Sequence, residues 1–359
     1  MKCTIQNIAD HLGLSRNTVS KALKNSSEVS ENTRNLVIKT ASKLGYKNAT
    51  FATPVIPASE TGSNGTILFL TRTYASDSEF WTTVLRGIES ILSNANYHLA
   101  ISIMSDSDLK QLNFPQTISD SSIKGIILVE ICDKVVCDAL SQFNLPIVSV
   151  DMPNVPFEEL NGIDVVTMES KKNLKKIINQ LIEKGAESFG FVGDLYSPNV
   201  SRGFQERYNA LSECLAEHQL PLNQKNCLLH QTPEDFRNFQ TTVNNLQAMI
   251  SLPDVFICGN DWTAIQLIYA LQFLGFQIPK NICVVGFDNI PAASRISPSL
   301  TTISTPQKYL GIAAARQILE RIQHPNCPHV FCQYETELII RNSTNITSVS
   351  YTHLRAHET

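Results

Sequence analysis

Apolar residues recur with helical spacing in two short segments at the start of the chain, and a tight turn separates the segments. The apolar positions are Ile5, Ile8, Ala9 and Leu12 in the first segment, and Val19, Ala22 and Leu23 in the second. Gly13 permits the turn, and Ser15 is a suitable N-cap for the helix that follows. The pattern predicts two packed helices within residues 4–25.

A third helix is predicted over residues 30–43, with Ser30 as its N-cap. Its buried stripe would consist of Val37, Ile38, Ala41 and Leu44. Gly45 is a typical C-terminal stop for such a helix. Three short helices with this turn form a minimal helix-turn-helix domain, which places its second helix in the major groove of DNA.

The polar face of the second helix suits the recognition of base edges. Because the apolar face of the second helix is used for packing, we expect Arg16, Asn17 and Lys21 to point outward. Arg and Lys can donate to guanine O6 and N7, and Asn can pair with adenine. Residues 1–50 contain eight basic and three acidic side chains, whereas the whole chain carries a net charge of -4. A basic head on an acidic body is expected if only the head meets phosphate.

The pattern changes after this head. Residues 48–64 are small and polar and contain Pro54 and Pro57, which is the composition of a linker. Beyond them, apolar strand segments alternate with helical segments, which predicts an α/β fold of parallel sheets with helices on both faces. One set of strands ends at Asp151 and another begins near Ile163, so we expect two lobes, each with a doubly wound sheet.

The predicted strands are GTILFLT, YHLAISIM, GIILVE, PIVSVD, SFGFVGD, DVFICG, ICVVGFD, SLTTIST and CQYETELII. The predicted helices cover residues 80–92, 169–184, 207–219, 261–275 and 307–323.

Ligands bind open sheets at the carboxyl ends of the strands, so two lobes offer a cleft where both sets of strand ends meet. The residues expected there are Ser78, Phe80, Trp81, Asp151, Arg207 and Asp261. Arg207 and Asp261 form the principal pair, because a guanidinium fork and a carboxylate can hold the hydroxyls of a small polar ligand. Phe80 or Trp81 would stack on its apolar face. The alternative is that Asp261 merely caps a helix and Arg207 lies on the surface.

Composition narrows the function further. Nine cysteines form no CxxC pair and no zinc-type spacing with histidine, so we expect reduced thiols and neither a metal nor a cofactor. The N-terminus lacks an apolar signal segment and no apolar run is long enough to cross a membrane, so we expect a cytoplasmic protein without membrane contact. No GxxxxGK, GxSxG, HExxH or strand-following GxGxxG motif calls for enzymatic chemistry.

Several segments of the chain resemble the lactose and galactose repressor family of bacterial transcription regulators. They are TIQNIADHLGLSRNTVSKALKN, VSENTR, LGYK and PDVFICGNDWTAIQLIYALQFLGFQIPKNICVVGFDNIP followed by PSLTTI. The resemblance runs from Thr4 to about Thr344 and implies a core like the periplasmic sugar-binding proteins, with three crossovers between its lobes. It also implies a double-stranded DNA operator and a small-molecule effector, a carbohydrate or its derivative, as partners of a homodimer or larger homo-oligomer.

Site residues follow from the resemblance by position. Arg16, Asn17 and Lys21 resemble the base readers of the family. The other DNA-facing candidates are Thr4, Ser15, Thr18, Ser20, Asn25, Tyr46, Lys47, Phe51 and Val55. Asp261 matches the effector-binding aspartate of the family. Arg207 matches its effector-binding arginine, with Ala210 where the family usually has Gly.

The chain departs from the family pattern in three places. Glu169-Ser170 stands where the family has Asp-Asn before the first helix of the second lobe, and Gly185-Ala186 replaces the Gly-His that closes that helix. The usual hinge helix is replaced by a segment that contains Pro54, which disfavours helical geometry. We therefore expect a short or absent hinge helix, with Phe51 rather than Val55 as the wedge in the minor groove.

The predicted organisation is a helix-turn-helix domain over residues 1–47, a linker or degenerate hinge over 48–64 and an effector-binding core over 65–345. The N-lobe would comprise residues 65–161 and 291–322, and the C-lobe residues 162–290 and 323–345. Residues 349–359 resemble the translation of a sequencing adapter, so we expect that they are not part of the natural protein. The leading hypothesis is a ligand-responsive transcriptional regulator, most simply a repressor. The alternatives are a cytoplasmic solute-binding protein, which the basic head opposes, and an enzyme.

Overall fold

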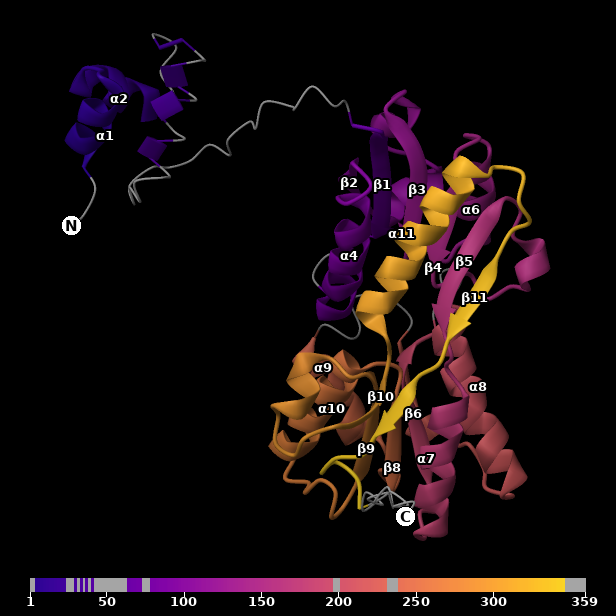
Figure 1. Cartoon of the computed structure of the whole chain (residues 1–359). Helices are drawn as coiled ribbons and strands as arrows, with labels where there is room; N and C mark the ends of the chain where they lie inside the picture. The colour runs from indigo at the N-terminus through magenta and orange to yellow at the C-terminus, as the bar shows by residue number, and fades with distance from the viewer. Residues whose placement is uncertain are drawn as a thin grey trace, which may run out of the picture. The chain divides into compact units, whose positions relative to one another are not determined.

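The computed structural model describes residues 4–23, 29–30, 33–34, 36–37, 40–41, 63–72, 78–195, 201–230 and 238–345 (Figure 1). The chain forms two compact units, Met1–Gly62 and Ser63–Thr359. We call the first unit the head and the second the core, and describe each by itself.

The head contains the predicted pair of helices. Helix α1 (Ile5–Leu12) begins at Thr4, whose hydroxyl accepts a hydrogen bond from the backbone N–H of Asn7 at 3.3 Å, while the Asn7 side chain accepts from the Thr4 N–H at 2.8 Å. This reciprocal capping satisfies two N–H groups that the first turn leaves unpaired. Gly13 ends α1 in the left-handed conformation. Helix α2 (Arg16–Leu23) follows Ser15, whose hydroxyl accepts from the Thr18 N–H at 3.0 Å, so the predicted turn and cap are confirmed.

The described part of the third predicted helix agrees with its capping and its buried stripe. The Ser30 hydroxyl accepts from the Thr33 N–H at 3.4 Å. Val37 and Ala41 have helical backbone and are buried against Ile8 and other residues of α1 and α2. Ile38, Leu44 and Gly45 lie outside the described residues.

The core contains two six-stranded sheets, which define an N-lobe and a C-lobe. The N-lobe sheet has the order β11-β5-β4-β3-β1-β2, and all its neighbours are parallel. Its strands are β1 (Gly65–Arg72), β2 (Tyr97–Met104), β3 (Ile123–Val129), β4 (Ile147–Val150), β5 (Ile163–Met168) and β11 (Phe331–Tyr334).

The C-lobe sheet repeats this order as β12-β10-β9-β8-β6-β7, with β12 antiparallel to β10. Its strands are β6 (Phe189–Asp194), β7 (Leu228–His230), β8 (Val255–Cys258), β9 (Cys283–Asp288), β10 (Thr301–Ser304) and β12 (Glu337–Ile339). In both sheets the first strand of the set lies between the second and the third. This order creates a topological switch point between β1 and β3 and another between β6 and β8, where ligands of such sheets bind.

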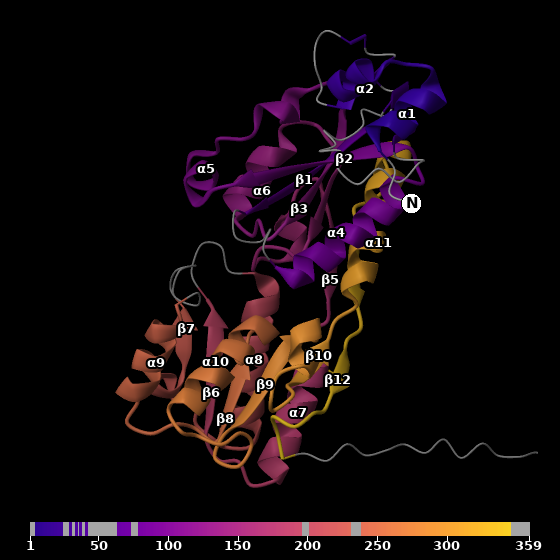
Figure 2. The ribbon, with the colours of Figure 1, turned by 90° about the vertical axis from the view of Figure 1, so that its left-hand side faces the viewer.

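Helices cover both faces of each sheet (Figure 2). The N-lobe has α4 (Glu79–Leu92), α5 (Asp106–Gln111), α6 (Lys134–Ser141) and α11 (Gln307–Gln323). The C-lobe has α7 (Lys172–Glu183), α8 (Arg202–Glu217), α9 (Phe239–Ala248) and α10 (Asp261–Phe273). Short 3-10 helices are η2 (Gln116–Ser119), η3 (Phe157–Glu159), η4 (Gln224–Asn226) and η5 (Pro291–Ser294).

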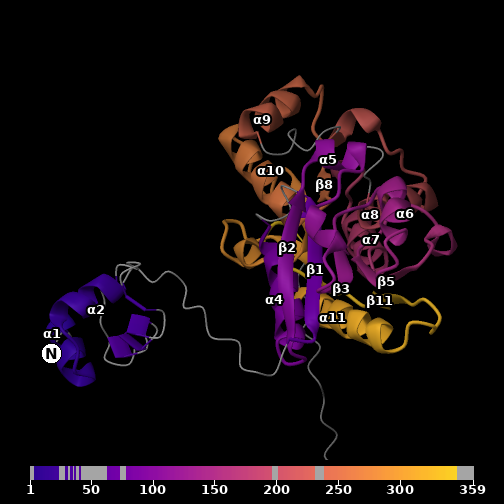
Figure 3. The ribbon, with the colours of Figure 1, turned by 90° about the horizontal axis from the view of Figure 1, so that it is seen from above.

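Alternate residues of β1 separate the two faces of the N-lobe sheet. Ile67 and Phe69 are buried with α4 and α11, whereas Leu68 and Leu70 are buried with α5, α6 and η2. Figure 3 shows α4 and α11 on the opposite side of the strands from α5 and α6. A strand that is apolar on both sides is what a buried parallel sheet requires.

The strand pairing corrects the lobe boundaries predicted from the sequence. Strand β5, predicted in the C-lobe, pairs with β4 of the N-lobe, and β10, predicted in the N-lobe, pairs with β9 of the C-lobe. Residues 332–340, predicted as one strand of the C-lobe, form β11 in the N-lobe and β12 in the C-lobe. The reason for the errors is that an apolar strand has the same pattern in either sheet. The chain therefore crosses between lobes after β5, β10 and β11.

Other differences concern single elements. Helix α8 begins at Arg202, five residues before the predicted start, and α7 begins at Lys172, three residues after it. The sequence analysis did not predict α5, α6, α9 or β7. These elements are short, and short apolar segments carry little periodicity.

Candidate DNA-binding head and interlobe site

The structure places the three predicted base readers on α2. Arg16 and Asn17 are exposed in its first turn and Lys21 is half-buried in its last, while Val19 and Ala22 are buried. The apolar side of α2 is thus used for packing and the Arg16–Asn17 end is accessible. A helix of this kind presents its N-terminal residues to base edges in the major groove.

Only some of the other predicted DNA contacts lie within the described residues. The side chains of Thr4 and Ser15 cap helices, and those of Thr18 and Ser20 are half-buried. Asn25, Tyr46, Lys47, Phe51 and Val55 lie outside the described residues, as do the hinge and all but the last two residues of the linker. The roles of all nine residues stay predictions.

In the core, acidic residues stand at the carboxyl ends of strands from both lobes. Glu130 follows β3 and Asp151 follows β4 in the N-lobe, while Asp288 ends β9 in the C-lobe. Arg207 of α8 has electrostatic interactions with Asp151 and Asp288, and Glu130 has one with Asp151. We call Glu130, Asp151, Ser170, Arg207 and Asp288 the interlobe site.

Arg207 is the cation of this site and is almost fully buried, with 4% of its surface exposed. Its Nη1 donates to the carbonyl of Gly259 at 2.7 Å, and its guanidinium carbon lies 3.6 Å from the ring centroid of Phe287. Burial lowers the pKa of Arg207, and the nearby carboxylates of Asp288 and Asp151 oppose this effect. The Nε atom of Arg207 has no hydrogen-bond partner. A buried donor without a partner is expected where a ligand or a water completes the site.

Asp151 connects the two lobes. Its carboxylate accepts hydrogen bonds from the Met152 N–H at 2.8 Å and from the hydroxyl of Ser201 in the C-lobe. The carbonyl of Met152 accepts from the Arg202 N–H at 3.0 Å, and Pro153 forms a β-bridge with Ser201. Residues 151–153 and 201–202, which we call the latch, hold the lobes together at one edge of the interlobe site.

The structure gives Asp261 partners within the fold, and its predicted role as an effector ligand stays a prediction. Asp261 is fully buried, and its oxygens accept from the Thr302 hydroxyl at 2.5 Å and from the Ile290 N–H at 2.9 Å. Burial raises its pKa to about 7, while these hydrogen bonds lower it. The N-cap of α10 is Asn260, so Asp261 is not a helix cap either. In this structure Asp261 ties α10 to the segments that follow β9 and form β10.

The remaining predicted residues lie at the start of α4 in the N-lobe. Ser78 is the N-cap of α4 and accepts from the Trp81 N–H at 3.5 Å. Phe80 and Trp81 are buried in the core, with their rings in edge-to-face contact. The Trp81 indole N–H donates to the Glu130 carboxylate. Trp81 therefore reaches the interlobe site through Glu130, and Phe80 packs behind it.

Sequence reasoning missed Glu130, Ser170 and Asp288. Glu130 and Asp288 each follow or end an apolar strand, which is the signal that selected Asp151. Ser170 is 1% exposed, and its hydroxyl has no hydrogen-bond partner. It was noted only as a departure from the family pattern, although it lies at the first crossover.

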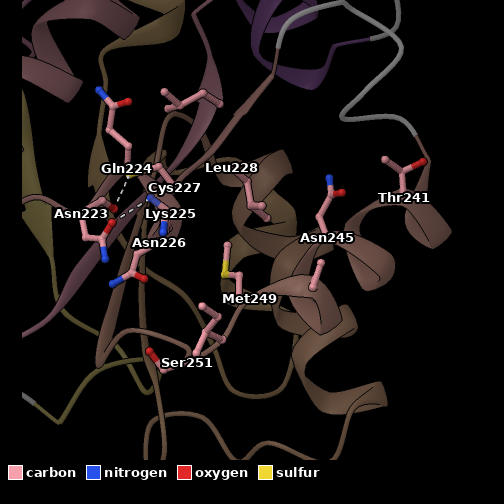
Figure 4. A pocket seen from close by; sticks show the side chains of 13 residues that line it. Asn223, Gln224, Lys225, Asn226, Cys227, Leu228, Thr241, Asn245, Met249 and Ser251 are labelled. Atoms are coloured by element: carbon pink, nitrogen blue, oxygen red, sulfur yellow. Dashed lines mark hydrogen bonds between the residues drawn. The ribbon is translucent and has the colours of Figure 1, made fainter.

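A separate pocket of about 860 Å³ lies at the edge of the C-lobe sheet (Figure 4). It is lined by η4, β7, one side of α9 and residues 249–251, including Asn226, Leu228, Asn245 and Met249. These residues stand near the amino ends of the strands, so this pocket is distinct from the interlobe site.

A head with an exposed base-reading helix and a two-lobed α/β core with charged strand ends define a DNA-binding regulator joined to a ligand-binding module. Comparisons with known proteins agree with this class. Residues 4–48 match the family of bacterial regulatory proteins of the lacI type, and residues 178–344 match the periplasmic binding protein-like domain. The chain belongs to the lacI family, and it is a DNA-binding transcriptional regulator rather than an enzyme.

Curated relatives span almost the whole chain. The HTH-type transcriptional repressor PurR of Photobacterium profundum is 26% identical over 345 residues, which are 95% of this chain and 98% of the relative. The ribose operon repressor of Haemophilus influenzae is 26% identical over 344 residues, with the same coverage of each chain. Catabolite control protein A of Staphylococcus xylosus is 27% identical over 341 residues, 92% of this chain and 97% of the relative.

Solved structures support the fold. The lac repressor dimer bound to operator and anti-inducer is 18% identical with a TM-score of 0.65, and the match covers 96% of this chain and 99% of that chain. A LacI family regulator from Enterococcus faecium with bound ribose is 24% identical with a TM-score of 0.64, over 78% of this chain and 98% of that chain. Among the helices of the described residues, none combines the length and the apolar character needed to cross a membrane.

Proposed function

We propose that the protein is a ligand-responsive repressor that binds a pseudo-palindromic operator as a homodimer. Its effector would be a small polar molecule, a sugar or a sugar derivative, bound at the interlobe site. The observation that carries this proposal is the buried Nε atom of Arg207, which has no hydrogen-bond partner at the meeting point of strand ends from both lobes. Such an atom costs free energy unless a ligand or water satisfies it.

The names of related proteins support both parts of the proposal. The relatives include repressors, one of them the repressor of a ribose operon, and a related structure holds ribose. We assign residues 1–47 to operator binding, 48–64 to the connection and 65–345 to effector binding. Because the operator is bacterial DNA, we place the protein in the cytoplasm.

The latch provides a route from ligand to DNA. Effector binding between the lobes would favour one lobe orientation over another. The contacts between residues 151–153 and 201–202 would form or break when the orientation changes. In a dimer, a change of lobe orientation alters the spacing of the two heads relative to two half-sites. Coupling of about 1–3 kcal/mol is enough to change operator occupancy substantially.

The DNA part predicts that Arg16→Ala and Asn17→Ala each cost about 1–3 kcal/mol of binding free energy at particular base pairs. Operators selected from a random duplex library, with affinities measured against single-base variants, would test this. Lys47→Ala is the matched contrast, since loss of a phosphate contact should weaken all sequences alike and reduce the salt slope by about one. Equal affinity of the unmodified protein for selected and random DNA would refute operator recognition.

The effector part predicts that Arg207→Lys weakens ligand binding at least about tenfold, because an ammonium cannot reproduce the planar guanidinium contacts. Ligands would come from a thermal-shift screen of sugars and nucleosides, followed by calorimetry and operator release. Arg295→Lys, an exposed position in the same lobe, is the control. Both variants should keep operator affinity without ligand. Unchanged ligand affinity in Arg207→Lys would remove Arg207 from the site.

A further inference from the structure

The interlobe site holds more negative than positive charge. Glu130, Asp151 and Asp288 interact electrostatically with one another, and Arg207 is the cation coupled to Asp151 and Asp288. Arg72 also faces Glu130, but its Nη2 is paired with Asp106 at 2.7 Å. Arg207 also interacts with Glu206 and Asp261, so the carboxylates around this guanidinium outnumber the cations that face them. A buried excess of negative charge has to be neutralised by protons or by a cation.

The titration of these carboxylates reflects the excess. Burial raises the pKa of Glu130 to about 7, although the Trp81 N–H and Arg72 lower it. Burial also raises the pKa of Asp288 well above its usual range despite the nearby Arg207, and it raises the pKa of Asp151. Protons therefore occupy part of the site when no ligand is bound. An ammonium group placed there would neutralise the same charge without protonation.

Backbone geometry shows that these acids are held in place at a cost. Glu130, Asp151 and Asp288 have φ values of 56°, 72° and 116°, all in the left-handed region that favours glycine. Non-glycine residues in such conformations are strained and cluster at functional sites. Three strained acids at three neighbouring strand ends indicate a demand for carboxylates, because glycine would serve the turns better.

Unpaired polar atoms lie beside the acids, independent of their charge. The Ser170 hydroxyl and Arg207 Nε have no hydrogen-bond partner, and both residues are more than nine-tenths buried. A β carbon on Gly203 would lie 3.5 Å from Ser170 Oγ, 3.3 Å from Arg207 Nη2 and 3.7 Å from Ser201 Oγ. Ser201 in turn donates to Asp151. A side chain at Gly203 would touch all three polar groups, so glycine at this position lets them lie close together. One oxygen of Glu130 is also unpaired.

We propose that the interlobe site takes a positively charged effector, a small polyhydroxy molecule with a free amine such as an amino sugar. Glu130, Asp151 and Asp288 receive the ammonium group, and Ser170 and Arg207 bind hydroxyl groups. This inference rests on the proposed effector function and adds its charge. An effector with a phosphate or carboxylate is disfavoured, because it would place further negative charge beside these acids.

The test compares matched sugars on the full chain by thermal shift and calorimetry near pH 7, where the amino groups of these sugars are largely protonated. Each of glucosamine, galactosamine and mannosamine is measured beside its neutral parent hexose, its N-acetyl form and the 6-phosphate of the parent, up to tens of millimolar. The N-acetyl form keeps the size and removes the charge. We expect at least one amine to raise Tm more than its parent and its N-acetyl form, and the phosphates to give no rise.

Glu130→Gln identifies the group that reads the charge. The amide keeps an acceptor for the Trp81 N–H, so the variant should fold. We expect it to bind the amine at least about tenfold more weakly, with little change for the neutral parent. Glu159→Gln, an exposed acid of the same lobe, should leave both affinities unchanged. Gly203→Ala is the second variant: the added methyl group would press on Arg207 and Ser170, so it should weaken binding of all sugars, and the Tm of the ligand-free variant shows whether its fold is kept.

The outcomes separate this proposal from the function on which it rests. If neutral sugars or sugar phosphates raise Tm as much as the amines and release operator DNA, the effector function stands and the charge assignment is wrong. The charge assignment is also wrong if no amine raises Tm, or if Glu130→Gln binds amine and parent in the same ratio as the unmodified protein. If ligands bind the core but none of them alters operator affinity, the regulatory function itself fails.

Discussion

At the scale of single residues, Asp164 of β5 is the most heavily engaged buried charge. Arg321 of α11 donates to both carboxylate oxygens, at 3.0 and 2.8 Å, and the Val330 N–H donates at 2.8 Å. Arg321 also donates to the carbonyls of Pro328 and Cys327, so one ion pair holds the segment between α11 and β11. The exposed fraction of the Arg321 side chain is 5%, and that of the Asp164 side chain is 0%. A buried pair with this many hydrogen bonds is costly to break from one side.

We predict that Asp164→Asn lowers the free energy of unfolding by about 3 kcal/mol, because Arg321 is left buried without its counter-charge. Urea unfolding at neutral pH measures the loss. Burial raises the pKa of Asp164, but hydrogen bonds from Arg321, Val330 and Gln317 together lower it by more, so the pKa in the folded protein is below its usual value.

The contribution of Asp164 is therefore present above the ordinary Asp pKa of about 3.9 and is lost as the pH falls through the lower pKa of the folded state. Asp138→Asn, which removes an exposed pair with Lys134, is the control and should have little effect. If Asp164→Asn left the free energy of unfolding almost unchanged, the hydrogen bonds from Arg321 to backbone carbonyls would be sufficient to stabilise its buried charge.

At the scale of elements, the N-lobe depends on a close crossing of α4 and α11. A β carbon on Gly311 would lie 2.0 Å from the carbonyl oxygen of Val84, and one on Gly87 would lie 2.2 Å from that of Lys308. Glycine in the middle of a helix is usually unfavourable relative to alanine. At these two positions it lets the helix backbones touch, which no other residue permits.

We predict that Gly311→Ala destabilises the protein by about 2 kcal/mol or more, since the added methyl group forces the helices apart. Lys308→Ala, an exposed position of the same helix, should be close to neutral. Chemical unfolding of the two variants compares them directly. If Gly311→Ala were as stable as Lys308→Ala, the helices would be free to separate without cost.

At the scale of the whole core, buried carboxylates within and beside the interlobe site make stability depend on pH. Glu130 and Asp261 have pKa values of about 7 in the folded protein, because burial disfavours their charged forms. Their values in the unfolded chain are about 4.3 and 3.9. A raised pKa contributes stability that is complete below the unfolded value and is lost as the pH rises through the folded value.

We therefore predict that the Tm of the ligand-free protein falls between about pH 4.5 and pH 7.5. Asp151 and Asp288, whose pKa values are also raised, act in the same direction, and Arg72 and Arg207 moderate the fall. Glu130→Gln should flatten the profile and Glu159→Gln should not. A Tm that rises over this range would mean that the carboxylates are ionised and stabilised in the fold.

The sequence allowed some features to be predicted because they depend on near neighbours. The caps at Ser15 and Ser30 join residues three apart, and helical spacing along the chain indicates which face of α2 is buried. The apolar runs of β1 and β3 identify both segments as strands of a buried sheet. The polar residues that follow such runs mark the strand ends, where site residues are expected. This reasoning predicted that Asp151 and Arg207 lie near each other, and the structure couples them electrostatically. Their role in binding stays a prediction.

Tertiary structure decided the rest. Which sheet receives β5, β10 or β11 depends on hydrogen-bond partners distant in the chain, and apolar composition is the same in either lobe. The two oxygens of Asp261 are occupied by groups 29 and 41 residues away, which no local pattern reveals. Gly311 needs its lack of a side chain only because α4 crosses there. The charge of the interlobe site likewise arises where strand ends of two lobes meet, since each acid alone would be an ordinary turn residue.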